Sequence, residues 1–367
     1  MEAKSWFNLS LFNTPKAGEY FEYLVQGIDP MWSMTDIKAR VLDVREETHD
    51  TQTWVLRPTA RWKGFEAGQH LHITFAINGA NQTRTFTISS TPYEWQDQGT
   101  ITLTVKRVPN GRVTGWMHDE LKAGAIVTLS QAAGDFVLPK EPEGPIAYFA
   151  AGSGITPIAS QLGKLAACKM PVPATLFYFA RSEQDYIFGA HLKALAQAHK
   201  RFTLHTIAAD GGYPDVKYSL PQTMISAEHV TAALQDNPEF VYVCGPHPFR
   251  EQVKKLLSEQ GYPLNKVKEE AFGLPPVART PGEKVTVTFS NSHTAATTDQ
   301  PGTLLDMAEE AGLKPTAGCR MGICYTCKCT KKSGQVRNVL TGEISSADEE
   351  DIQICVSTPV SNVEIEL

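Results

Sequence analysis

Five of the seven cysteines fall within the last 49 residues of this 367-residue chain. Four of them follow the order Cys319-x4-Cys324-x2-Cys327, with Cys355 after 27 intervening residues. Four thiolates at this spacing are typical of one known class of [2Fe–2S] cluster loop. Zinc is the competing ligand, but structural zinc sites favour paired C-x2-C units, and this segment holds only one such pair. We therefore predict a [2Fe–2S] cluster here, with a zinc ribbon as the alternative.

The other three cysteines have different surroundings. Cys329 is either a bystander or a fifth, alternative ligand. Cys244 stands in a Cys-Gly-Pro sequence that ends an apolar run, and Cys168 has no assigned role. Because the cysteines gather in one segment, we expect a reducing compartment and not a disulfide-stapled secreted protein.

The segment Arg84–Ser90 reads R-T-F-T-I-S-S at the end of a β-rich run. An arginine on a barrel strand can clamp a phosphate. Phe86 lies two residues further along, on the same face of the strand, and can stack on a flat ring. The hydroxyl of Thr87 can form a hydrogen bond with the edge of that ring. The competing interpretation is a half-buried strand that is rich in threonine. We take Arg84, Thr85, Phe86 and Thr87 as candidate flavin-binding residues.

A second segment supports the flavin prediction. A strand at Thr104–Arg107 is followed by a turn and the start of a helix at Gly111–Thr114. The unpaired N–H groups of such a helix start bind phosphate, and a pyrophosphate indicates FAD in preference to FMN. The candidate residues are Val105, Arg107, Gly111, Val113 and Thr114.

A glycine-rich turn follows the next buried strand and opens a helix. It reads G-S-G-I-T-P from Gly152 to Pro157, and its context strengthens the dinucleotide signal. Pro157 suits the first helical turn, where no N–H group is needed. The nucleotide-binding candidates in this turn are Gly152, Gly154, Ile155, Thr156 and Pro157.

Two later strands end with further candidates. Arg181 and Ser182 are placed where an adenosine ribose or its 2′-phosphate would lie, although Arg181 could equally be a solvated arginine. Cys244, Gly245 and Pro246 end another strand at the same carboxyl edge, and we expect Cys244 to face the nicotinamide in preference to being a buried core thiol.

The elements that must position these residues form distinct blocks along the chain. Residues 36–140 predict a barrel of six short strands: Ile37–Val44, Thr51–Arg57, His70–Ile77, Thr83–Ser89, Thr100–Val108 and Ile126–Leu129. Residues 141–273 alternate strands (Ile146–Ala150, Ala174–Phe179, Phe202–Ile207, Phe240–Cys244) with helices (Thr156–Ala167, His191–His199, Phe249–Gln260), which indicates a doubly wound parallel α/β domain.

A Pro-rich linker over 274–283 precedes the last domain, 284–367. This domain has expected strands at Val285–Phe289 and Val363–Leu367 and a helix at Thr303–Ala311. Residues 1–35 form an extension with seven aromatic residues before position 35. The extension is either a helix that packs on the main body or a peripheral membrane contact through residues 1–34.

Composition and charge exclude several classes of protein. A net charge of −6 with 42% apolar residues argues against disorder and against nucleic-acid binding. Five of the six excess negative charges lie in residues 283–367, as 7 basic against 12 acidic residues. That region is either a solvated face or an acidic face for a basic partner. No secretory signal or run of 18 apolar residues occurs, so we expect a cytoplasmic monomer, with the inner membrane face as an alternative place.

The order of these motifs resembles the ferredoxin–NADP⁺ reductase superfamily with a C-terminal plant-type ferredoxin domain, over residues 36–367. The fusion is similar to reductase subunits of ring-hydroxylating and phenylacetyl-CoA oxygenases, and residues 24–44 resemble electron-transfer partners of bacterial membrane desaturases. The resemblance implies a flavin-binding barrel, a nucleotide-binding α/β domain and a β-grasp ferredoxin domain. It implies catalytic roles for Thr87, Cys244 and Glu270, and cluster ligation by the four cysteines.

The resemblance further implies a function. The chain would pass electrons from NAD(P)H to FAD, then to the [2Fe–2S] cluster, and then to an external acceptor. We expect a fatty-acid or acyl-CoA desaturase as that acceptor and NADPH as the donor. The alternatives are an oxygenase as acceptor and, from another class, a non-catalytic flavin and iron–sulfur redox sensor.

Overall fold

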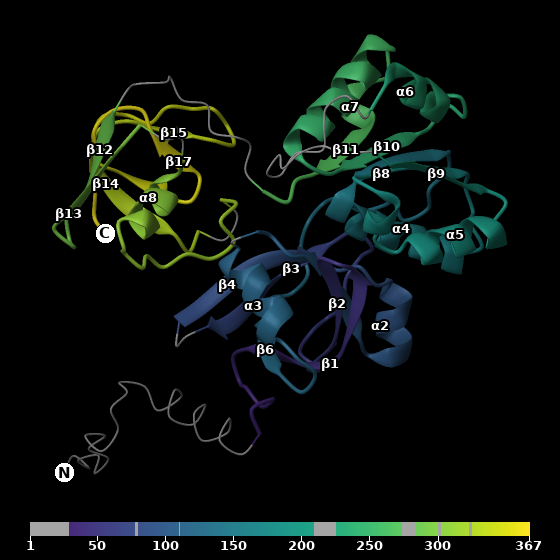
Figure 1. Cartoon of the computed structure of the whole chain (residues 1–367), viewed down its shortest axis with the longest axis horizontal. Coiled ribbons are helices and arrows are strands. Elements are labelled where there is room, and N and C mark those ends of the chain that lie inside the picture. Colours follow the sequence, from purple (N-terminus) through teal and green to yellow (C-terminus); the bar gives the residue numbers. More distant parts are fainter. Residues whose placement is uncertain are drawn as a thin grey trace, which may run out of the picture.

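The computed structural model describes residues 29–77, 80–109, 111–208, 225–273, 284–299, 302–322 and 325–367. Figure 1 shows the barrel, the parallel sheet with its helices and the C-terminal domain in the order that the sequence predicts. Three predictions fall outside the described residues: the aromatic segment up to residue 28, the linker over 274–283, and Cys324. No helix in the described ranges combines the length and the apolar character that crossing a membrane requires.

The barrel is a six-stranded antiparallel sheet in the order β4-β3-β6-β1-β2-β5. Its strands are β1 (Ile37–Thr48), β2 (Thr51–Pro58), β3 (His70–Ile77), β4 (Ala80–Thr87), β5 (Ile101–Lys106) and β6 (Ile126–Leu129). Just after β4, Ile88 pairs with Leu103 of β5, which joins the two outer strands and closes the sheet. Alternate apolar side chains such as Leu71, Ile73 and Phe75 fill the interior, as the period of two requires.

Two helices accompany the barrel. Helix α3 (Arg112–Glu120) begins after Gly111, as predicted. Helix α2 (Pro92–Gln98) was not predicted, although Thr91 and Glu94 form a reciprocal capping box and Pro92 occupies the first turn. The Thr-Pro-Tyr-Glu sequence is therefore typical of a helix N-terminus, although only strands were predicted around it.

The second domain is a five-stranded parallel sheet in the order β11-β10-β7-β8-β9. Its strands are β7 (Ile146–Ala151), β8 (Ala174–Ala180), β9 (Phe202–Ala208), β10 (Phe240–Cys244) and β11 (Val267–Glu270). One face packs on α4 (Ile155–Ala167) and α5 (Gly189–Ala198), and the other on α6 (Ala227–Leu234) and α7 (His247–Glu259). The doubly wound prediction is confirmed, while α6 and the short charged edge strand β11 were not foreseen.

The C-terminal domain is a mixed sheet in the order β13-β12-β18-β14-β16, with a separate pair, β15-β17. Its strands are β12 (Val285–Phe289), β13 (Thr294–Thr298), β14 (Lys328–Ser333), β15 (Val336–Asn338), β16 (Glu350–Gln353), β17 (Ser357–Pro359) and β18 (Val363–Ile365). Strands β12 and β18 are parallel, and α8 (Leu304–Glu310) buries Leu304, Leu305 and Met307 in the same core as Phe289. This arrangement agrees with the β-grasp prediction.

Candidate functional site

Strand β4 carries the predicted flavin residues along one edge of the barrel. The hydroxyl of Thr85 is 2.8 Å from Nδ1 of His72 on β3, and Thr87 is 6% exposed. Phe86 packs in part against the barrel core and is half-buried, so part of its side chain stays accessible. The strand therefore holds its polar groups in fixed positions beside an aromatic surface.

Arg84 lies in a concentration of positive charge. Burial, together with the nearby guanidinium groups of Arg320 and Arg112, lowers the pKa of Arg84 to about 10, while Glu309 acts in the opposite direction. Three arginines from the barrel strand, the start of α3 and the C-terminal domain thus repel one another here. A bound anion would relieve that repulsion, so the residues present fit a flavin diphosphate.

The turn before α3 is tightly built. A Cβ on Gly111 would come within 2.6 Å of Thr114 Oγ1 and 2.8 Å of the Val108 side chain. Thr114 Oγ1 accepts a hydrogen bond of 3.1 Å from the Val108 N–H, which leaves its own hydrogen free to donate. This turn fits phosphate binding, as the sequence predicts.

Three other residues predicted for the flavin site have contacts within the barrel domain. Val105 and Val113 belong to the barrel core, at 3% and 2% exposure. The Arg107 guanidinium makes two hydrogen bonds, of 2.7 and 2.8 Å, to the Asp119 carboxylate. The side chains of Val105 and Val113 therefore support the barrel, and Arg107 is already paired.

The glycine turn that follows β7 brings the nucleotide-binding candidates to the carboxyl end of the sheet. Gly152 has φ +54°, which favours glycine, and its carbonyl accepts a hydrogen bond of 3.1 Å from the Tyr178 hydroxyl. Thr156 is buried and donates to the Ser153 carbonyl at 3.1 Å. Ile155 and Pro157 are buried in the first turn of α4, so they shape the turn from within.

The same turn touches the end of β10 and the barrel. A Cβ on Gly154 would lie 2.2 Å from the carbonyl oxygen of Cys244, so only glycine permits this approach. Further along α4, Ser160 Oγ donates to the Ser90 carbonyl at 2.6 Å. The nucleotide turn thus lies between Cys244 and the segment that follows Thr87.

Cys244 and Glu270 end the adjacent strands β10 and β11 in register. The Cys244 thiol is fully buried, and burial, together with the Glu270 charge, raises its pKa well above the usual value. Burial also raises the pKa of Glu270, against the hydrogen bond and charge of His70. His70 Nδ1 lies 3.2 Å from Glu270 Oε1, and Oε2 of the same carboxylate is buried without a hydrogen-bond partner. A buried acceptor of this kind fits a bound polar group.

Gly245 and Pro246 connect β10 to α7. A Cβ on Gly245 would come within 2.9 Å of both Ala151 Cβ and Phe249 Cδ1, so this position is packed between two elements. Pro246 caps the N-terminus of α7. Both residues fix the chain direction directly after Cys244.

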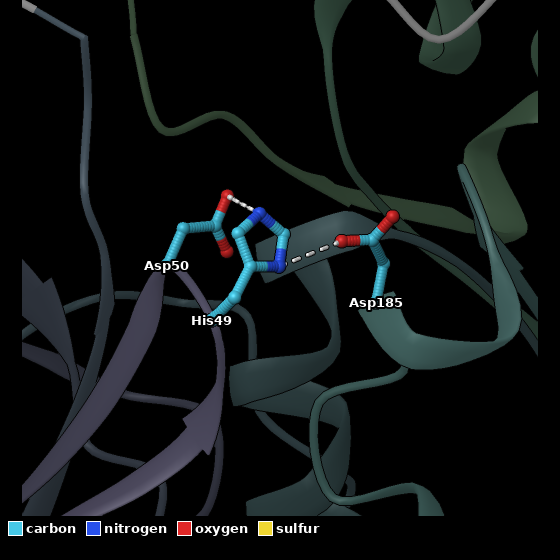
Figure 2. Close-up of side chains that lie close together, drawn as sticks. All are labelled: His49, Asp50 and Asp185. Carbon is cyan, nitrogen blue, oxygen red and sulfur yellow. Dashed lines mark ion pairs between the residues drawn. The ribbon is translucent and has the colours of Figure 1, made fainter. Parts of the chain in front are cut away.

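Arg181 and Ser182 follow β8 beside a charged cluster that joins the barrel to the second domain. Arg181 is 59% exposed in its side chain and lies 3.3 Å from Asp50 and 4.0 Å from Asp185, and Ser182 Oγ donates to Asp185 at 2.9 Å. Figure 2 shows the imidazole of His49 between these two carboxylates, 3.7 Å from Asp50 and 3.6 Å from Asp185.

Asp50 in this cluster already has counter-charges. Although burial acts to raise it, the ammonium of Lys106 at 3.1 Å holds the pKa of Asp50 below its usual value. His49, Asp50 and Asp185 offer ligand-type atoms within 4.8 Å of one another. Lys106 and Arg181 pair with Asp50, whereas Oδ1 of Asp185 is buried with no hydrogen-bond partner in the described part of the chain and lies 3.6 Å from His49 Nδ1.

The cysteine loop gathers buried thiols. Cys319, Cys327 and Cys355 are 3%, 3% and 2% exposed. The hydrogen bond from Cys355 lowers the pKa of Cys327 to about 6, and the same bond raises the pKa of Cys355. Three thiols at such close range form a donor set that suits a cluster.

The backbone of this loop is strongly bent. Arg320 and Tyr325 have φ +58° and +57°, which non-glycine residues seldom adopt. Gly322 has φ +78°, and a Cβ there would come within 3.0 Å of Leu340 and Val356. Cys329, on β14, lies outside the loop, and burial raises its pKa to about 12, which suits the bystander interpretation.

Comparisons with known proteins agree with the three domains. Residues 38–138 match the oxidoreductase FAD-binding domain, residues 149–255 the oxidoreductase NAD-binding domain, and residues 287–360 the 2Fe-2S iron-sulfur cluster binding domain. An NADPH oxidoreductase of Mycobacterium tuberculosis is 30% identical over 331 residues, which cover 90% of this chain and 84% of that protein. The chain belongs to the family of NAD(P)H-dependent flavin and iron–sulfur reductases.

Two further relatives extend this finding. A glycine betaine monooxygenase reductase subunit of Chromohalobacter salexigens is 28% identical over 359 residues, covering 91% of this chain and 96% of that one. The solved structure of phthalate dioxygenase reductase has the same fold, with a TM-score of 0.63 and 22% identity over 91% of this chain and 98% of that one. This reductase therefore uses FAD, NAD(P)H and a [2Fe–2S] cluster, and the zinc-ribbon alternative is wrong.

Sequence reasoning missed several residues around the reductase site. His70 is 200 positions from Glu270, and no motif marks it. The register of β3 against β4 places His70 opposite Thr87, so alignment of the two strands would have brought it to the site. Neither Asp50 nor Arg320 was among the predicted site residues.

Proposed function

We propose that this reductase takes electrons from NADPH and delivers them singly to a membrane fatty-acid or acyl-CoA desaturase. The position of Arg84 is the observation that supports the proposed route of electrons within the chain. This flavin-phosphate candidate lies within electrostatic reach of Arg320, which directly follows the cluster-ligand candidate Cys319. When bound, FAD would supply the conversion between two-electron hydride chemistry and the one-electron chemistry of the cluster.

The chain's own residues orient the two nucleotides. We propose that Arg84, Thr114 and the start of α3 hold the flavin diphosphate, and that Phe86 stacks on the flavin ring. Thr87 would donate its hydroxyl to the ring edge.

The nicotinamide would lie beside the Gly154 turn and the end of β10 at Cys244, two segments whose backbones are in close contact. Glu270 would accept a hydrogen bond through its unpartnered Oε2. His70 is a positioning residue, since its ring holds the other carboxylate oxygen at 3.2 Å. The raised pKa of Cys244 keeps the thiol neutral beside the nicotinamide.

The preference for NADPH would rest on Arg181. Its exposed side chain is free to leave Asp50 for a 2′-phosphate, because an exposed ion pair contributes only about 0–1 kcal/mol. Ser182 is held by Asp185 at the same strand end. The Mycobacterium tuberculosis relative is an NADPH oxidoreductase, which supports this choice.

The desaturase proposal rests on the sequence of residues 24–44 and on exposed side chains near residue 29, the first that the structure describes. Trp32 and Met34 are 54% and 57% exposed there. Large exposed apolar side chains suit contact with a membrane or with a membrane-bound partner. A peripheral contact through residues 1–34 would bring the reductase to its acceptor.

A soluble oxygenase is the second candidate acceptor. Relatives named as reductase subunits of glycine betaine monooxygenase and stachydrine N-demethylase favour it, because both match more than four fifths of this chain. The redox-sensor alternative would bind the same cofactors without turnover, and the membership in a reductase family argues against it.

Reconstitution separates these acceptors. Purified holoprotein and NADPH would be combined with a membrane desaturase in lipid vesicles or with an iron oxygenase in solution, and product formation measured against NADPH consumed. We expect coupled turnover with the desaturase. Coupling with the oxygenase alone would replace the proposed acceptor, and no turnover with cytochrome c would support the sensor.

A further inference from the structure

A groove of about 580 Å³ lies on the C-terminal domain beside the cluster loop. Strands β14, β15 and β16 contribute to its lining, together with the turn that precedes β14. The side chains that matter below are Tyr325, Lys328, Glu343, Ile344, Glu350 and Asp351. We call this feature the acceptor groove.

The acceptor groove adjoins two of the described cluster-ligand candidates. Tyr325 and Lys328 stand on either side of the Thr326–Cys327 pair. Gln353, another lining residue, pairs with Lys328 and donates to the Gly322 carbonyl at 2.9 Å. Gln353 is also two residues from Cys355. An object seated in the groove would therefore lie directly beside the cysteine loop.

The groove exposes apolar side chains that a bound partner would cover. Tyr325 and Ile344 are 65% and 50% exposed. Leu340 is 51% exposed and lies against Gly322 of the cysteine loop. Aromatic and aliphatic groups of this kind, ringed by polar residues, are typical of the centre of a protein–protein interface.

The rim of the groove is acidic. Three carboxylates and one ammonium line it: Asp351 pairs with Lys328 at 2.8 Å, and Glu350 lies 3.4 Å from the fully buried Lys331. Glu343 accepts a hydrogen bond from Thr341, and within the described ranges no cation lies at ion-pair distance from it. Glu343 is therefore the carboxylate best able to attract a positive charge from outside.

We propose that the acceptor groove docks the electron-accepting protein, which inserts an apolar side chain between Tyr325 and Ile344 and sets a lysine or arginine against Glu343. This inference rests on the proposed function, since it names the surface used by that acceptor. The flavin side of the loop carries Arg320, with its side chain toward Glu309 and Arg84, whereas Tyr325 faces the groove. Electrons would enter past Arg320 and leave past Tyr325.

The test uses the holoprotein with NADPH and two acceptors, the basic protein cytochrome c and the small anion ferricyanide. Glu343→Lys is expected to raise the KM for cytochrome c about threefold to tenfold, and Ile344→Ser to raise it about threefold. Screening by salt should reduce the effect of Glu343→Lys and leave that of Ile344→Ser unchanged. Ferricyanide turnover should stay at the wild-type level or rise slightly with Glu343→Lys.

Glu310→Lys is the matched control, because it makes the same charge change on an exposed residue of this domain outside the groove lining. We expect it to leave the KM for cytochrome c within twofold of wild type. If Glu310→Lys and Glu343→Lys raise the KM for cytochrome c equally, the effect comes from the net charge of the domain and not from the groove, which would contradict the role of Glu343. A wild-type KM in both groove variants would overturn it.

Failure of the proposed function has a different signature. If the chain were a redox sensor, the wild-type holoprotein would reduce neither cytochrome c nor ferricyanide, and if the acceptor were an oxygenase, reconstitution with the desaturase would give no coupled turnover while cytochrome c reduction persisted. If the groove instead holds a small molecule, both groove variants would leave the KM for cytochrome c unchanged, which also overturns the docking proposal.

Discussion

Gly154 makes the closest approach in the nucleotide site, and Gly154→Ala tests whether that approach matters. The added Cβ would lie 2.2 Å from the Cys244 carbonyl oxygen, 2.5 Å from its carbonyl carbon and 2.8 Å from the Gly245 nitrogen. Unstrained contacts need about 3.5 Å, so the glycine turn and the end of β10 must separate by about 1 Å. All three atoms belong to the backbone, so no side-chain rotation can relieve the clash.

The expected cost follows from this displacement. Overpacking a tight position costs about 1–3 kcal/mol of folding free energy. A displacement of about 1 Å at a reacting centre can cost about 100-fold in rate. We therefore expect Gly154→Ala to lower the kcat/KM of flavin reduction by NADPH about 10- to 100-fold. The assay is anaerobic stopped-flow bleaching of the bound flavin, with a urea melt of the same preparation.

Gly261→Ala is a control that distinguishes backbone strain from displacement of the glycine turn. Gly261 has φ +77° and open space around its Cβ, so alanine there costs about 1–2 kcal/mol through the backbone alone, far from the glycine turn. This control should lose stability and keep wild-type flavin reduction. If Gly154→Ala also loses only stability, the approach of the turn to Cys244 has no part in nucleotide binding.

Four further predictions concern single residues. Cys324→Ser should abolish reduction of cytochrome c while NADPH still bleaches the flavin, and equal loss of both would contradict separate sites. Arg84→Ala should weaken FAD binding about 10- to 100-fold in a fluorescence titration of apoprotein, since a hydrogen bond to a charged group contributes about 1.5–3 kcal/mol, and an unchanged Kd would refute its role. Arg181→Ala should lower the NADPH/NADH ratio of kcat/KM with little change in stability, and a constant ratio would exclude 2′-phosphate recognition. Burial raises the pKa of Glu270 above its usual 4.5. The folding stability that this shift contributes at low pH is therefore lost as the pH rises through the raised pKa. Glu270→Gln should remove that loss in urea melts between about pH 4 and pH 8, and parallel pH profiles of variant and wild type would argue against it.

The sequence predicted the parts of the fold in which periodicity and burial agree. The strands Ile146–Ala151 and Ala174–Ala180 are buried on both faces, and a continuous apolar run marks each of them. Strand β11 reads Val-Lys-Glu-Glu, and as a charged edge strand it has no such pattern. Its position depends on pairing with β10, which is information that only the tertiary fold contains.

The candidate site divides in the same way. Residues in a strand–turn–helix context, such as Gly154 and Thr156, could be placed from local spacing, because that context dictates the backbone path. Arg107 follows β5 as the local spacing predicts, and its guanidinium pairs with Asp119, a contact that the sequence did not predict. The His70–Glu270 contact joins two domains and lies beyond any local rule.

The charge of the C-terminal domain shows why a net count does not locate an interface. The excess of five acidic residues over residues 283–367 suggested a broad acidic face. Most of the described carboxylates near the cysteine loop have a cation in contact: Glu309 pairs with Arg320, Asp351 with Lys328, and Glu349 with Lys332. Such internal pairs cancel at the distance from which a partner approaches, because opposite charges a few ångströms apart present almost no field beyond a Debye length of about 8–10 Å. Among the carboxylates that line the groove, Glu343 is the one with no cation at ion-pair distance in the described residues, and it lies beside an exposed apolar surface, so it is a sharper candidate than the acidic count.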